Sequence, residues 1–291
     1  MVLKMPMNTI DLHMHSTCSD GTMTPRQLVA HANKLGMTVI SVTDHDTICH
    51  VKDVQFEAEQ QGIEIISGIE VSAEYEGRGT MHILGYFIDP ENDDIFDMLK
   101  KFREGRDERN PKIVEKLNEL GVKIEYTDVL KEAAGQSVGR PHIARVMLQK
   151  GYIRNTREAF DKYLAKGAPA YYDRVRFYPE KIISVIHAAG GLAFLAHPKQ
   201  LGIMNVRELE ALVQKLISQG LDGIEVYSSC QNKKEVKIYR TIAEKFDLLV
   251  SGGSDFHGIT KEHIEMGYIG EGASLDYSVI DAMRARIKSR N

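Results

Sequence analysis

Short apolar runs alternate along the chain with segments in which apolar residues recur every three or four positions. The first pattern predicts β-strands and the second predicts amphipathic helices. Because the connections are short, the alternation also predicts parallel strand pairing through β–α–β units. Strands are expected at 10–15, 37–46, 63–75, 80–89, 191–198, 221–229 and 248–258, and helices at 25–36, 51–62, 179–190, 206–220, 233–247 and 278–290.

Residues 91–172 interrupt this alternation, because they are helix-like and richly charged and contain no strong strand pattern. We call them the helical segment and predict a small insertion domain whose two ends lie close together on one face of the main domain. The main domain then comprises residues 8–90 and 173–291. Its roughly seven strand–helix units suit a small α/β barrel better than an open doubly wound sheet.

Composition narrows the class of protein. The 291 residues are 43% hydrophobic and 27% charged, and the net charge of −4 argues against a general affinity for nucleic acids or acidic membranes. No apolar run approaches the ~20 residues of a membrane span, and the first residues lack a signal-peptide core. Cys18, Cys49 and Cys230 are odd in number and scattered, which fits a reducing compartment better than a disulfide framework. We therefore expect a cytoplasmic protein with no membrane association and no obligate protein partner.

Residues that can bind metals stand at or near the ends of six apolar runs. His13 and His15 are two apart on a predicted strand, so both side chains point to one face and can reach one ion. Asp20 follows in a glycine-containing turn, where an aspartate by itself is more typical of a turn or a helix cap. His45 ends another strand in the sequence TDHD. The repetition predicts that several strand ends converge on one metal site.

Later strands continue this pattern. Glu70 ends the sequence GIE, where a buried carboxylate needs a partner that a metal supplies, and a carboxylate can also bridge two ions. His197 stands directly before Pro198, which ends its strand. Asp255 and His257 are two apart in SGGSDFHG, whose glycines leave room for a close approach of the backbone.

Several other histidines and acids have more than one interpretation. His82 begins its strand instead of ending it, so a surface or core role competes with metal binding. Either Asp44 or Asp46 is expected to orient an imidazole or to cap the next element. Glu225 ends a strand and is either a residue that supports the site or a purely structural carboxylate. Helical or loop surfaces are assigned to His31, His50, His187 and His263.

The ordered set of HxH, TDHD, GxE, AHP and SDFH resembles the PHP (polymerase and histidinol phosphatase) superfamily. The resemblance covers 10–89 and 178 to the end. It implies a distorted seven-stranded (β/α) barrel that carries up to three divalent metals and often hydrolyses phosphoesters. The metal ligands that it implies are His13, His15, Asp20, His45, Glu70, His82, His197, Asp255 and His257, of which His13, His15, Asp255 and His257 are taken as catalytic.

Within the helical segment, GRPHIARVMLQKG and FDKYLAKGAPAYY resemble the subfamily that cleaves 3′,5′-nucleotide bisphosphates and trims short RNA from its 5′ end. Arg140 offers a planar fork for phosphate, His142 can donate to a phosphate oxygen, and Lys166 can add a point charge. Arg109 is a further candidate for phosphate binding. Arg103 and Arg106 are instead expected on a solvated helical face, paired with neighbouring acids.

The expected reaction is attack on phosphorus by a hydroxide that the metals activate. The mixed nitrogen and oxygen ligands are compatible with Mn²⁺, which we favour, and with Zn²⁺ or Fe²⁺. The expected substrate is a small phosphorylated nucleotide or a short oligonucleotide. Three alternatives are a histidinol-phosphate or other small phosphomonoester phosphatase, an amidohydrolase-like hydrolysis at carbon, and a non-catalytic metal-binding module. The sequence leaves open the native metal, the base preference, the general acid and the oligomeric state.

Overall fold

The computed structural model describes residues 9–133, 138–261, 263–270 and 273–290. Its strands form two sheets. The smaller sheet is parallel and contains, in spatial order, β1 (Ile10–Met14), β2 (Val39–Val42) and β3 (Glu64–Ile65). The larger sheet contains, in spatial order, β4 (Gly68–Ala73), β5 (Met81–Tyr86), β6 (Leu192–Leu195), β7 (Gly223–Ser228) and β8 (Leu249–Gly253).

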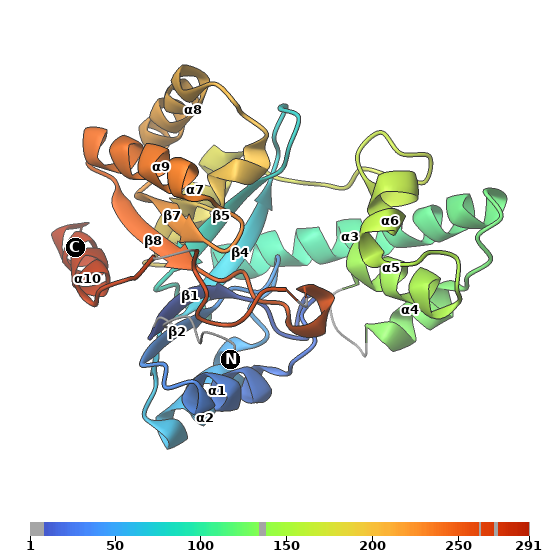
Figure 1. Cartoon of the computed structure of the whole chain (residues 1–291), viewed down its shortest axis with the longest axis horizontal. Coiled ribbons are helices and arrows are strands. Elements are labelled where there is room, and N and C mark those ends of the chain that lie inside the picture. Colours follow the sequence, from blue (N-terminus) through green and yellow to red (C-terminus); the bar gives the residue numbers. More distant parts are fainter. Residues whose placement is uncertain (1–8, 134–137, 262, 271–272, 291) are drawn as a thin grey trace, which may run out of the picture.

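Helices surround both sheets, as the periodic segments predicted. Figure 1 shows one group of helices around the larger sheet and a pair below the smaller one. The group contains α7 (Pro179–Ala188), α8 (Val206–Ser218), α9 (Lys233–Lys245) and α10 (Ser278–Arg290), and the pair contains α1 (Pro25–Lys34) and α2 (Val51–Gln61). None of the helices that the structure describes is long and apolar enough to cross a membrane.

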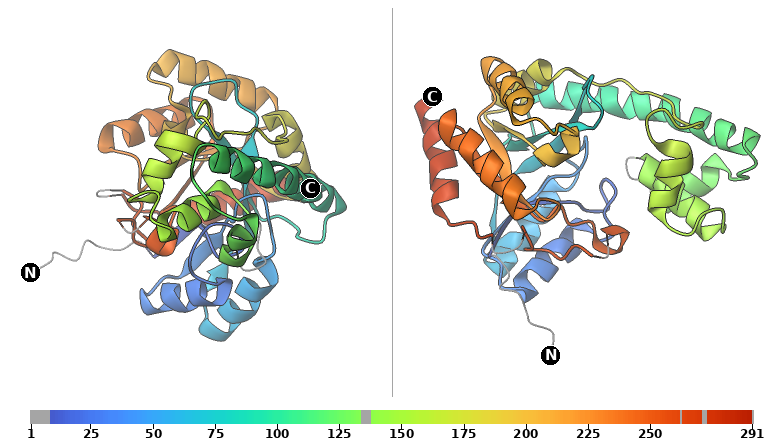
Figure 2. Two further views of the ribbon diagram at one scale, coloured as in Figure 1. Left: turned by 90° about the vertical axis from the view of Figure 1, so that its right-hand side faces the viewer. Right: turned by 45° about the horizontal axis from the view of Figure 1, so that its top comes forward.

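The helical segment extends away from the sheets. Its long first helix, α3 (Asp93–Glu119), runs outward and carries the shorter helices at its far end, as Figures 1 and 2 show. These are α4 (Tyr126–Glu132), α5 (Arg140–Gln149), α6 (Thr156–Ala159) and the π-helical turn η1 (Phe160–Leu164). Ile95 and Phe102 of α3 pack in the core of the larger sheet, whereas Ile113 and Leu117 pack in a separate core within the helical segment.

The two sheets meet along both of their edges. At one edge the backbone N–H of His15 donates to the carbonyl of Phe256 at 2.9 Å, and that of Asp255 donates to the carbonyl of His13 at 2.8 Å. At the other edge the N–H of Asp46 donates to the carbonyl of Glu70 at 2.9 Å. Both junctions therefore lie at the strand ends that carry the predicted metal ligands.

Two details of strand pairing differ from the predictions. β5 runs antiparallel to β4 and to β6, because the turn that joins β4 to β5 (residues 74–80) is too short for a crossover connection. The single strand expected at 63–75 is two strands, β3 and β4, which belong to different sheets. The change of sheet takes place at Gly68, where an added Cβ would lie only 2.2 Å from Ser41 Oγ. The fold is thus a mixed α/β structure with two sheets instead of one uniformly parallel array.

The cysteines also differ from the prediction. Cys18 and Cys49 form a disulfide, and Cys230 is free. Cys18 lies on the loop after β1 and Cys49 on the loop after β2. Because β1 and β2 pair in parallel, the loops that follow them leave the same edge of the sheet, so cysteines 31 positions apart in the sequence come together.

Candidate metal centre

The nine residues predicted as metal ligands converge at one end of the two sheets. They come from the ends of β1, β6 and β8, from the middle of β4, from the loops after β1 and β2, and from the start of β5. Three groups of them place one candidate ligand atom per residue within 4.8 Å of each other. The groups are His15, Asp20, His45 and His257; His13, His15 and Glu70; and His45, Glu70 and His82.

Glu70 occupies the middle of the cluster and is fully buried. Its Oε1 lies 2.8 Å from His82 Nδ1 and 2.7 Å from His197 Nε2. Its Oε2 lies 2.9 Å from His45 Nδ1 and 3.2 Å from His15 Nε2. The two oxygens therefore face different histidines, which is the arrangement of a carboxylate that can bridge two ions.

Asp255 and Asp20 supply the negative charge on the other side of the cluster. Asp255 Oδ1 lies 3.3 Å from His15 Nε2 and 3.7 Å from His13 Nε2. Asp20 Oδ1 lies 3.3 Å from His257 Nε2. Carboxylates and imidazoles thus alternate around the cluster, as expected for sites that bind divalent transition metals.

Several buried polar atoms in the cluster make no hydrogen bond of normal geometry, although some of them lie within ion-pair distance of one another. They are His13 Nε2, both ring nitrogens of His15, His45 Nδ1, Glu70 Oε2 and His197 Nδ1. A buried polar atom without a partner costs free energy, and native proteins seldom leave several of them together. Divalent cations would supply partners for these nitrogen and oxygen atoms. The residues of the cluster therefore fit a site for divalent metal ions.

Other contacts fix the ring orientation of two histidines. His13 Nδ1 donates to Glu225 Oε1 at 2.8 Å, which leaves its Nε2 free to face the cluster. Glu225 Oε2 also accepts from the backbone N–H of His197 at 2.6 Å. His257 Nδ1 donates to the carbonyl of Asp255 at 2.8 Å. Glu225, whose role the sequence left open, therefore orients residues of the cluster.

The antiparallel direction of β5 explains why His82 begins its strand. β5 runs opposite to its neighbours β4 and β6, so its first residues lie at the same edge as the last residues of the parallel strands. His82, the second residue of β5, therefore faces the same cluster as residues at the ends of other strands. The sequence identified His82 as a candidate ligand, but it did not predict the direction of the strand that carries it.

At the cluster the backbone adopts conformations that residues other than glycine seldom adopt. Positive φ angles occur at Asp46 (54°), His197 (21°) and Asp255 (56°). An added Cβ on Gly253 would lie 2.3 Å from the backbone nitrogen of His13, which confirms the predicted close approach. Such strain persists only where surrounding contacts enforce it, and it is concentrated at functional sites.

Asp44 organises the loop that carries Asp20. It accepts hydrogen bonds from the backbone N–H of Ser16 at 2.8 Å and from the hydroxyl of Ser19 at 2.6 Å. Its Oδ2 also lies 2.9 Å from Nδ1 of His50, which is buried and not on the surface as the sequence suggested. Burial opposes ionisation of Asp44, but His50 and the other donors lower its pKa to about 2.

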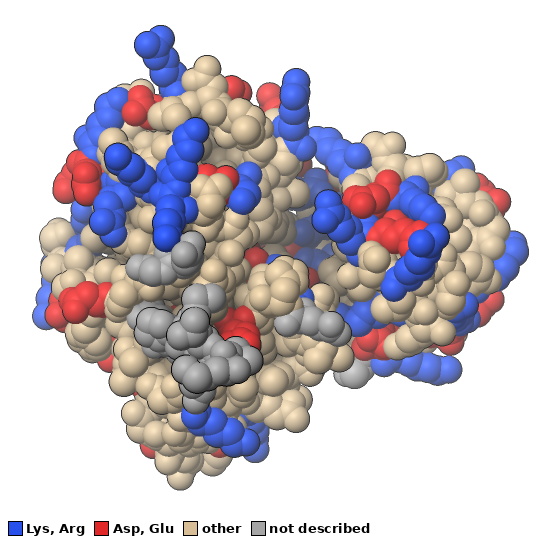
Figure 3. All heavy atoms as spheres, in the orientation of Figure 1, with Lys and Arg blue, Asp and Glu red and all other residues tan. Residues whose placement is uncertain are grey.

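Basic side chains line the same cavity as the metal centre. The cavity encloses about 250 Å³, and Figure 3 shows blue side chains in the hollow between the sheets and the helical segment. Asp46 accepts hydrogen bonds from Arg106 and, at 2.7 Å, from Arg174. Burial opposes ionisation of Asp46, but these two cations keep its pKa well below the usual value. The prediction of a solvated face for Arg106 was therefore wrong, because its side chain points into the cavity.

Three of the four predicted phosphate-binding residues line this cavity, namely Arg109, Arg140 and His142. Burial, and then the nearby guanidinium groups, lower the pKa of Arg109. His142 Nδ1 accepts from the backbone N–H of Gly139 at 3.0 Å, so in the neutral ring Nε2 carries the proton. Lys166 lies outside the cavity, exposed on a neighbouring hollow.

The apolar stripe of α3 contained a signal that could have identified Arg106 and Arg109. Ile95, Leu99, Phe102 and Ile113 are buried at helical spacing, and both arginines fall on the same face. A charged residue within an otherwise buried stripe needs a counter-ion or a ligand. This position in the stripe, rather than the local charge density, was the informative feature.

Two further basic residues were not predicted. Lys261 Nζ lies 2.6 Å from Asp255 Oδ2, the oxygen that does not face His15. Arg145 of α5 donates to the carbonyl of Asp20 at 3.2 Å and to Thr260 Oγ1 at 3.3 Å. Arg145 thus links the helical segment directly to the metal-bearing loops. Arg145 lies within the motif GRPHIARVMLQKG, but the sequence assigned it no role, and Lys261 belongs to no motif that the sequence analysis identified.

His142 should make the protein less stable as the pH falls from about 6.5 to about 4. Burial, and next the charge of Arg145, lower the pKa of His142 from 6.5 to about 4. In this range the unfolded chain binds a proton that the folded chain does not, so stability falls with falling pH. Over this pH range the free energy of unfolding of the wild type should fall by up to about 3 kcal/mol more than that of His142→Gln. In this variant the glutamine side chain can still accept a hydrogen bond from the backbone N–H of Gly139. Urea unfolding between about pH 7 and about pH 4 measures this difference, and equal pH dependences would contradict it.

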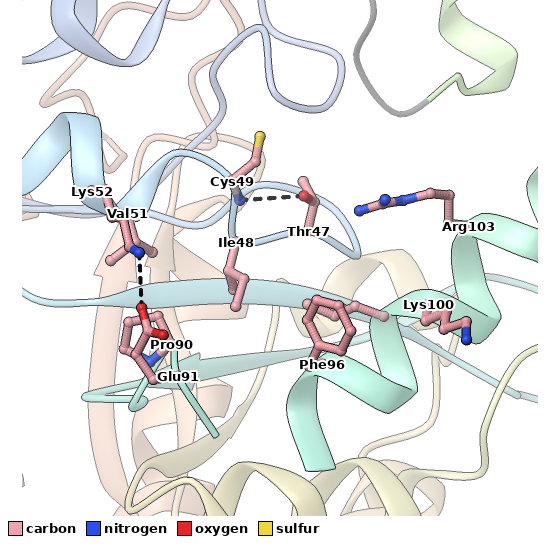
Figure 4. Close-up of a pocket in the computed structure, with 11 residues that line it drawn as sticks. Thr47, Ile48, Cys49, Val51, Lys52, Pro90, Glu91, Phe96, Lys100 and Arg103 are labelled. Carbon is pink, nitrogen blue, oxygen red and sulfur yellow. Dashed lines mark hydrogen bonds and ion pairs between the residues drawn. The ribbon is translucent and has the colours of Figure 1, made fainter. Parts of the chain in front are cut away.

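Another cavity, larger than that of the metal centre, lies away from this chemistry. It encloses about 580 Å³ between the start of α2 and the first half of α3 and includes Phe96, Lys100 and Arg103, as Figure 4 shows. Its rim carries the ion pair between Lys52 and Glu91 at 3.0 Å. It has no lining residue in common with the cavity of the metal centre.

Comparison with known proteins agrees with this geometry. Residues 11–173 match the family model described as the PHP domain. A 5′-3′ exoribonuclease of Haemophilus influenzae is 36% identical over 266 residues, which cover 91% of this chain and 94% of that protein. A 3′,5′-nucleoside bisphosphate phosphatase of Chromobacterium violaceum is 32% identical over 86% of this chain and 88% of that protein.

A solved structure has the same fold. A protein of Bifidobacterium adolescentis, described as a candidate metal-dependent phosphoesterase, superposes with a TM-score of 0.85 at 30% identity. The superposition covers 95% of this chain and 96% of that one. The family match, the relatives and the clustered ligands lead to one conclusion: the chain belongs to the PHP domain family and is a metal-dependent phosphoric ester hydrolase.

Proposed function

We propose that the protein hydrolyses the 3′-phosphate of nucleoside 3′,5′-bisphosphates and removes nucleotides from the 5′ end of short RNA. The observation that carries this proposal is the position of four arginines, Arg106, Arg109, Arg140 and Arg174, in the same cavity as the metal centre. We call them the arginine cluster. A substrate with two phosphates can then place one on the metal centre and one on the arginine cluster. The relatives from H. influenzae and C. violaceum, a 5′-3′ exoribonuclease and a 3′,5′-nucleoside bisphosphate phosphatase, support the same pair of substrates.

The proposed metal ligands are the nine predicted residues. Together they would hold up to three divalent cations, with Mn²⁺ favoured because imidazole and carboxylate ligands are mixed in every group. Bound cations supply Lewis acidity toward phosphate oxygens and lower the pKa of water to near neutrality. The chain itself contributes fixed ligand positions, through Glu225 on His13 and through Asp44 on the loop of Asp20.

The proposed role of the arginine cluster is to hold the 5′-phosphate of the substrate. Arg106 and Arg174 are already fixed by Asp46, and Arg140 is fixed by its donation to the carbonyl of Leu164 at 2.8 Å. Guanidinium groups held in place lose little freedom when they bind a phosphate. His142 adds a neutral N–H donor through Nε2.

Both proposed activities are the same chemical step. The oxygen of water joins phosphorus, the bond between phosphorus and O3′ breaks, and O3′ gains a proton. A bisphosphate then yields a nucleoside 5′-monophosphate and inorganic phosphate. RNA yields a 5′-mononucleotide and a shortened chain with a new 5′-phosphate. One site can therefore perform both reactions if it accommodates the rest of the RNA.

We also propose that the helical segment is a cap over the metal centre and that the two sheets together form one distorted barrel. The hydrogen bonds at both sheet edges support the barrel, and the separate apolar core of the helical segment supports a domain of its own at 91–172. Arg145 ties that domain to the loops of Asp20 and Thr260.

Phosphate release from adenosine 3′,5′-bisphosphate tests the proposal. With Mn²⁺, the rate should exceed those for AMP and for histidinol phosphate by at least about 10-fold, because only the bisphosphate also engages the arginine cluster. Chelation should abolish release from all three substrates, and added Mn²⁺ should restore it.

Other outcomes would redirect the proposal. A preference for histidinol phosphate would indicate a small phosphomonoester phosphatase and contradict the role of the arginine cluster. Undiminished activity after exhaustive chelation would contradict the metal centre itself.

A further inference from the structure

A second hollow adjoins the cavity of the metal centre. It lies between residues 74–80, which link β4 to β5, and residues 160–176, and it encloses about 540 Å³. We call it the hairpin groove. It shares part of its wall with the metal cavity, including His82, Arg140 and Arg174. Figures 1 and 2 show the β4–β5 hairpin rising beside the linker that leads from the helical segment back to the sheets. A long ligand can pass directly from the metal centre into this groove.

The hairpin groove carries free positive charge on its two sides. Arg78 on the hairpin and Lys166 on the helical segment are both exposed, and no ion pair joins either of them to an acidic residue in the described part of the chain. Arg176, in contrast, is neutralised by Asp173 and by Glu74, whose Oε2 lies 3.7 Å away. The groove therefore presents two available cations, one from each side, to a passing anion.

Aromatic residues line the same groove. Arg140 lies over the rings of Phe160 and Tyr171, with its guanidinium carbon 5.7 and 5.6 Å from their centroids. Tyr75 also lines the groove and is held by donation of its hydroxyl to the carbonyl of Leu201 at 3.3 Å. Cations combined with fixed aromatic rings are the surface on which single-stranded nucleic acid binds, by backbone contacts and base stacking.

Of the two proposed substrates, only RNA requires such a groove. In a nucleoside 3′,5′-bisphosphate, nothing extends beyond the scissile phosphate. In RNA, an oxygen of that phosphate carries the next nucleoside, which must leave the metal centre by an open route. The described structure provides that route past His82, which lines both the metal cavity and the hairpin groove.

We propose that the hairpin groove binds the nucleotides that follow the scissile phosphate of RNA, with Arg78 and Lys166 contacting their phosphodiester groups. This inference rests on the proposed function and adds a determinant of substrate length. Bisphosphates need only the metal centre and the arginine cluster, whereas oligonucleotides also need the groove. Lys166 thereby binds phosphate, as the sequence predicted, but it contacts a phosphodiester group of the RNA chain and not the terminal 5′-phosphate.

The rival route is the cavity in Figure 4, which also contains an exposed aromatic ring and two exposed cations, Phe96, Lys100 and Arg103. It shares no lining residue with the metal cavity, so a chain could not enter it directly from the scissile phosphate. Its lysine and arginine nevertheless form a matched control pair for Lys166 and Arg78.

The test compares two substrates in two double variants. The substrates are adenosine 3′,5′-bisphosphate and a 5′-phosphorylated trinucleotide. In the Arg78→Ala/Lys166→Ala variant, kcat/KM for the trinucleotide should fall about 10-fold, while that for the bisphosphate changes less than about 2-fold. The logarithmic salt dependence of the trinucleotide reaction should become shallower by about 0.7 for each cation removed. The Lys100→Ala/Arg103→Ala variant should leave both reactions unchanged.

Each other outcome overturns a defined statement. Equal losses on both substrates would place Arg78 and Lys166 at the terminal phosphate and overturn the groove assignment. An effect of the Lys100/Arg103 pair in place of the Arg78/Lys166 pair would show that the chain leaves by the other cavity. A wild-type protein that hydrolyses the bisphosphate but not the trinucleotide would overturn the groove and the RNA activity, and would leave the bisphosphate activity standing. A wild type inactive on both would overturn the proposed function with it.

Discussion

Glu70→Gln is expected to lower kcat for adenosine 3′,5′-bisphosphate by at least about 10³-fold. Both oxygens of Glu70 face histidines of the cluster, at 2.7 Å from His197 and 2.9 Å from His45. The amide removes the negative charge and turns one acceptor into a donor, so the variant would hold divalent cations less tightly than the carboxylate would. Losing several kcal/mol of metal-dependent stabilisation corresponds to this factor. Steady-state kinetics measure kcat, and elemental analysis of the purified variant should show a lower metal content.

The control for this change is Glu76→Gln, because Glu76 is exposed on the β4–β5 turn and the same carboxylate-to-amide substitution there should leave kcat and metal content unaltered. Asp255→Ala and His13→Ala should also lose most turnover while the fold is retained, which circular dichroism can verify. Full activity of Glu70→Gln with full metal content would remove Glu70 from the ligand set.

Arg140→Ala is expected to lower kcat/KM for adenosine 3′,5′-bisphosphate by about 10- to 100-fold. A charge-assisted hydrogen bond to phosphate contributes about 1.5–3 kcal/mol, and this variant removes such a donor from the proposed 5′-phosphate site. A simple aryl phosphate has no second phosphate, so its hydrolysis should change less than about 3-fold. Measuring both substrates in one buffer separates phosphate recognition from the chemistry at the metals.

Two further variants sharpen this comparison. Arg140→Lys keeps the charge but loses the planar fork, so it should recover only part of the activity. Arg157→Ala removes an exposed arginine of α6 whose side chain is 90% exposed, and it should be silent on both substrates. If Arg140→Ala affected the aryl phosphate as strongly as the bisphosphate, the arginine cluster would not be the second phosphate site.

Much of the metal centre could be predicted because its residues obey a local rule. His13 and His15 are two apart at the end of β1, and Asp255 and His257 are two apart directly after β8, so each pair lies at one edge. Strand ends that follow β–α–β units share one edge of a sheet, so the convergence followed from the pattern alone. The helix boundaries were predictable for a similar reason, since Thr24 and Pro25 begin α1 with local hydrogen bonds.

The arginine cluster was only partly predictable, because its members come from separate elements. Arg140 was marked by its local motif, but Arg106 and Arg174 meet at Asp46 from positions 68 residues apart on α3 and on the linker before α7. A partner so far away in the sequence leaves no local trace. Arg106 was therefore assigned to solvent, although its place in the apolar stripe of α3 pointed inward.

The sequence by itself determined the family, the alternation of strands and helices and the identity of the residues that gather at the strand ends, since these depend on residue type and spacing. Only the tertiary structure decided the division into two sheets, the antiparallel direction of β5, the Cys18–Cys49 pairing and the junction of the arginine cluster with the metal cavity. These features depend on chain reversals and on contacts between distant segments. Local periodicity records which face of an element is buried, but not which element covers it.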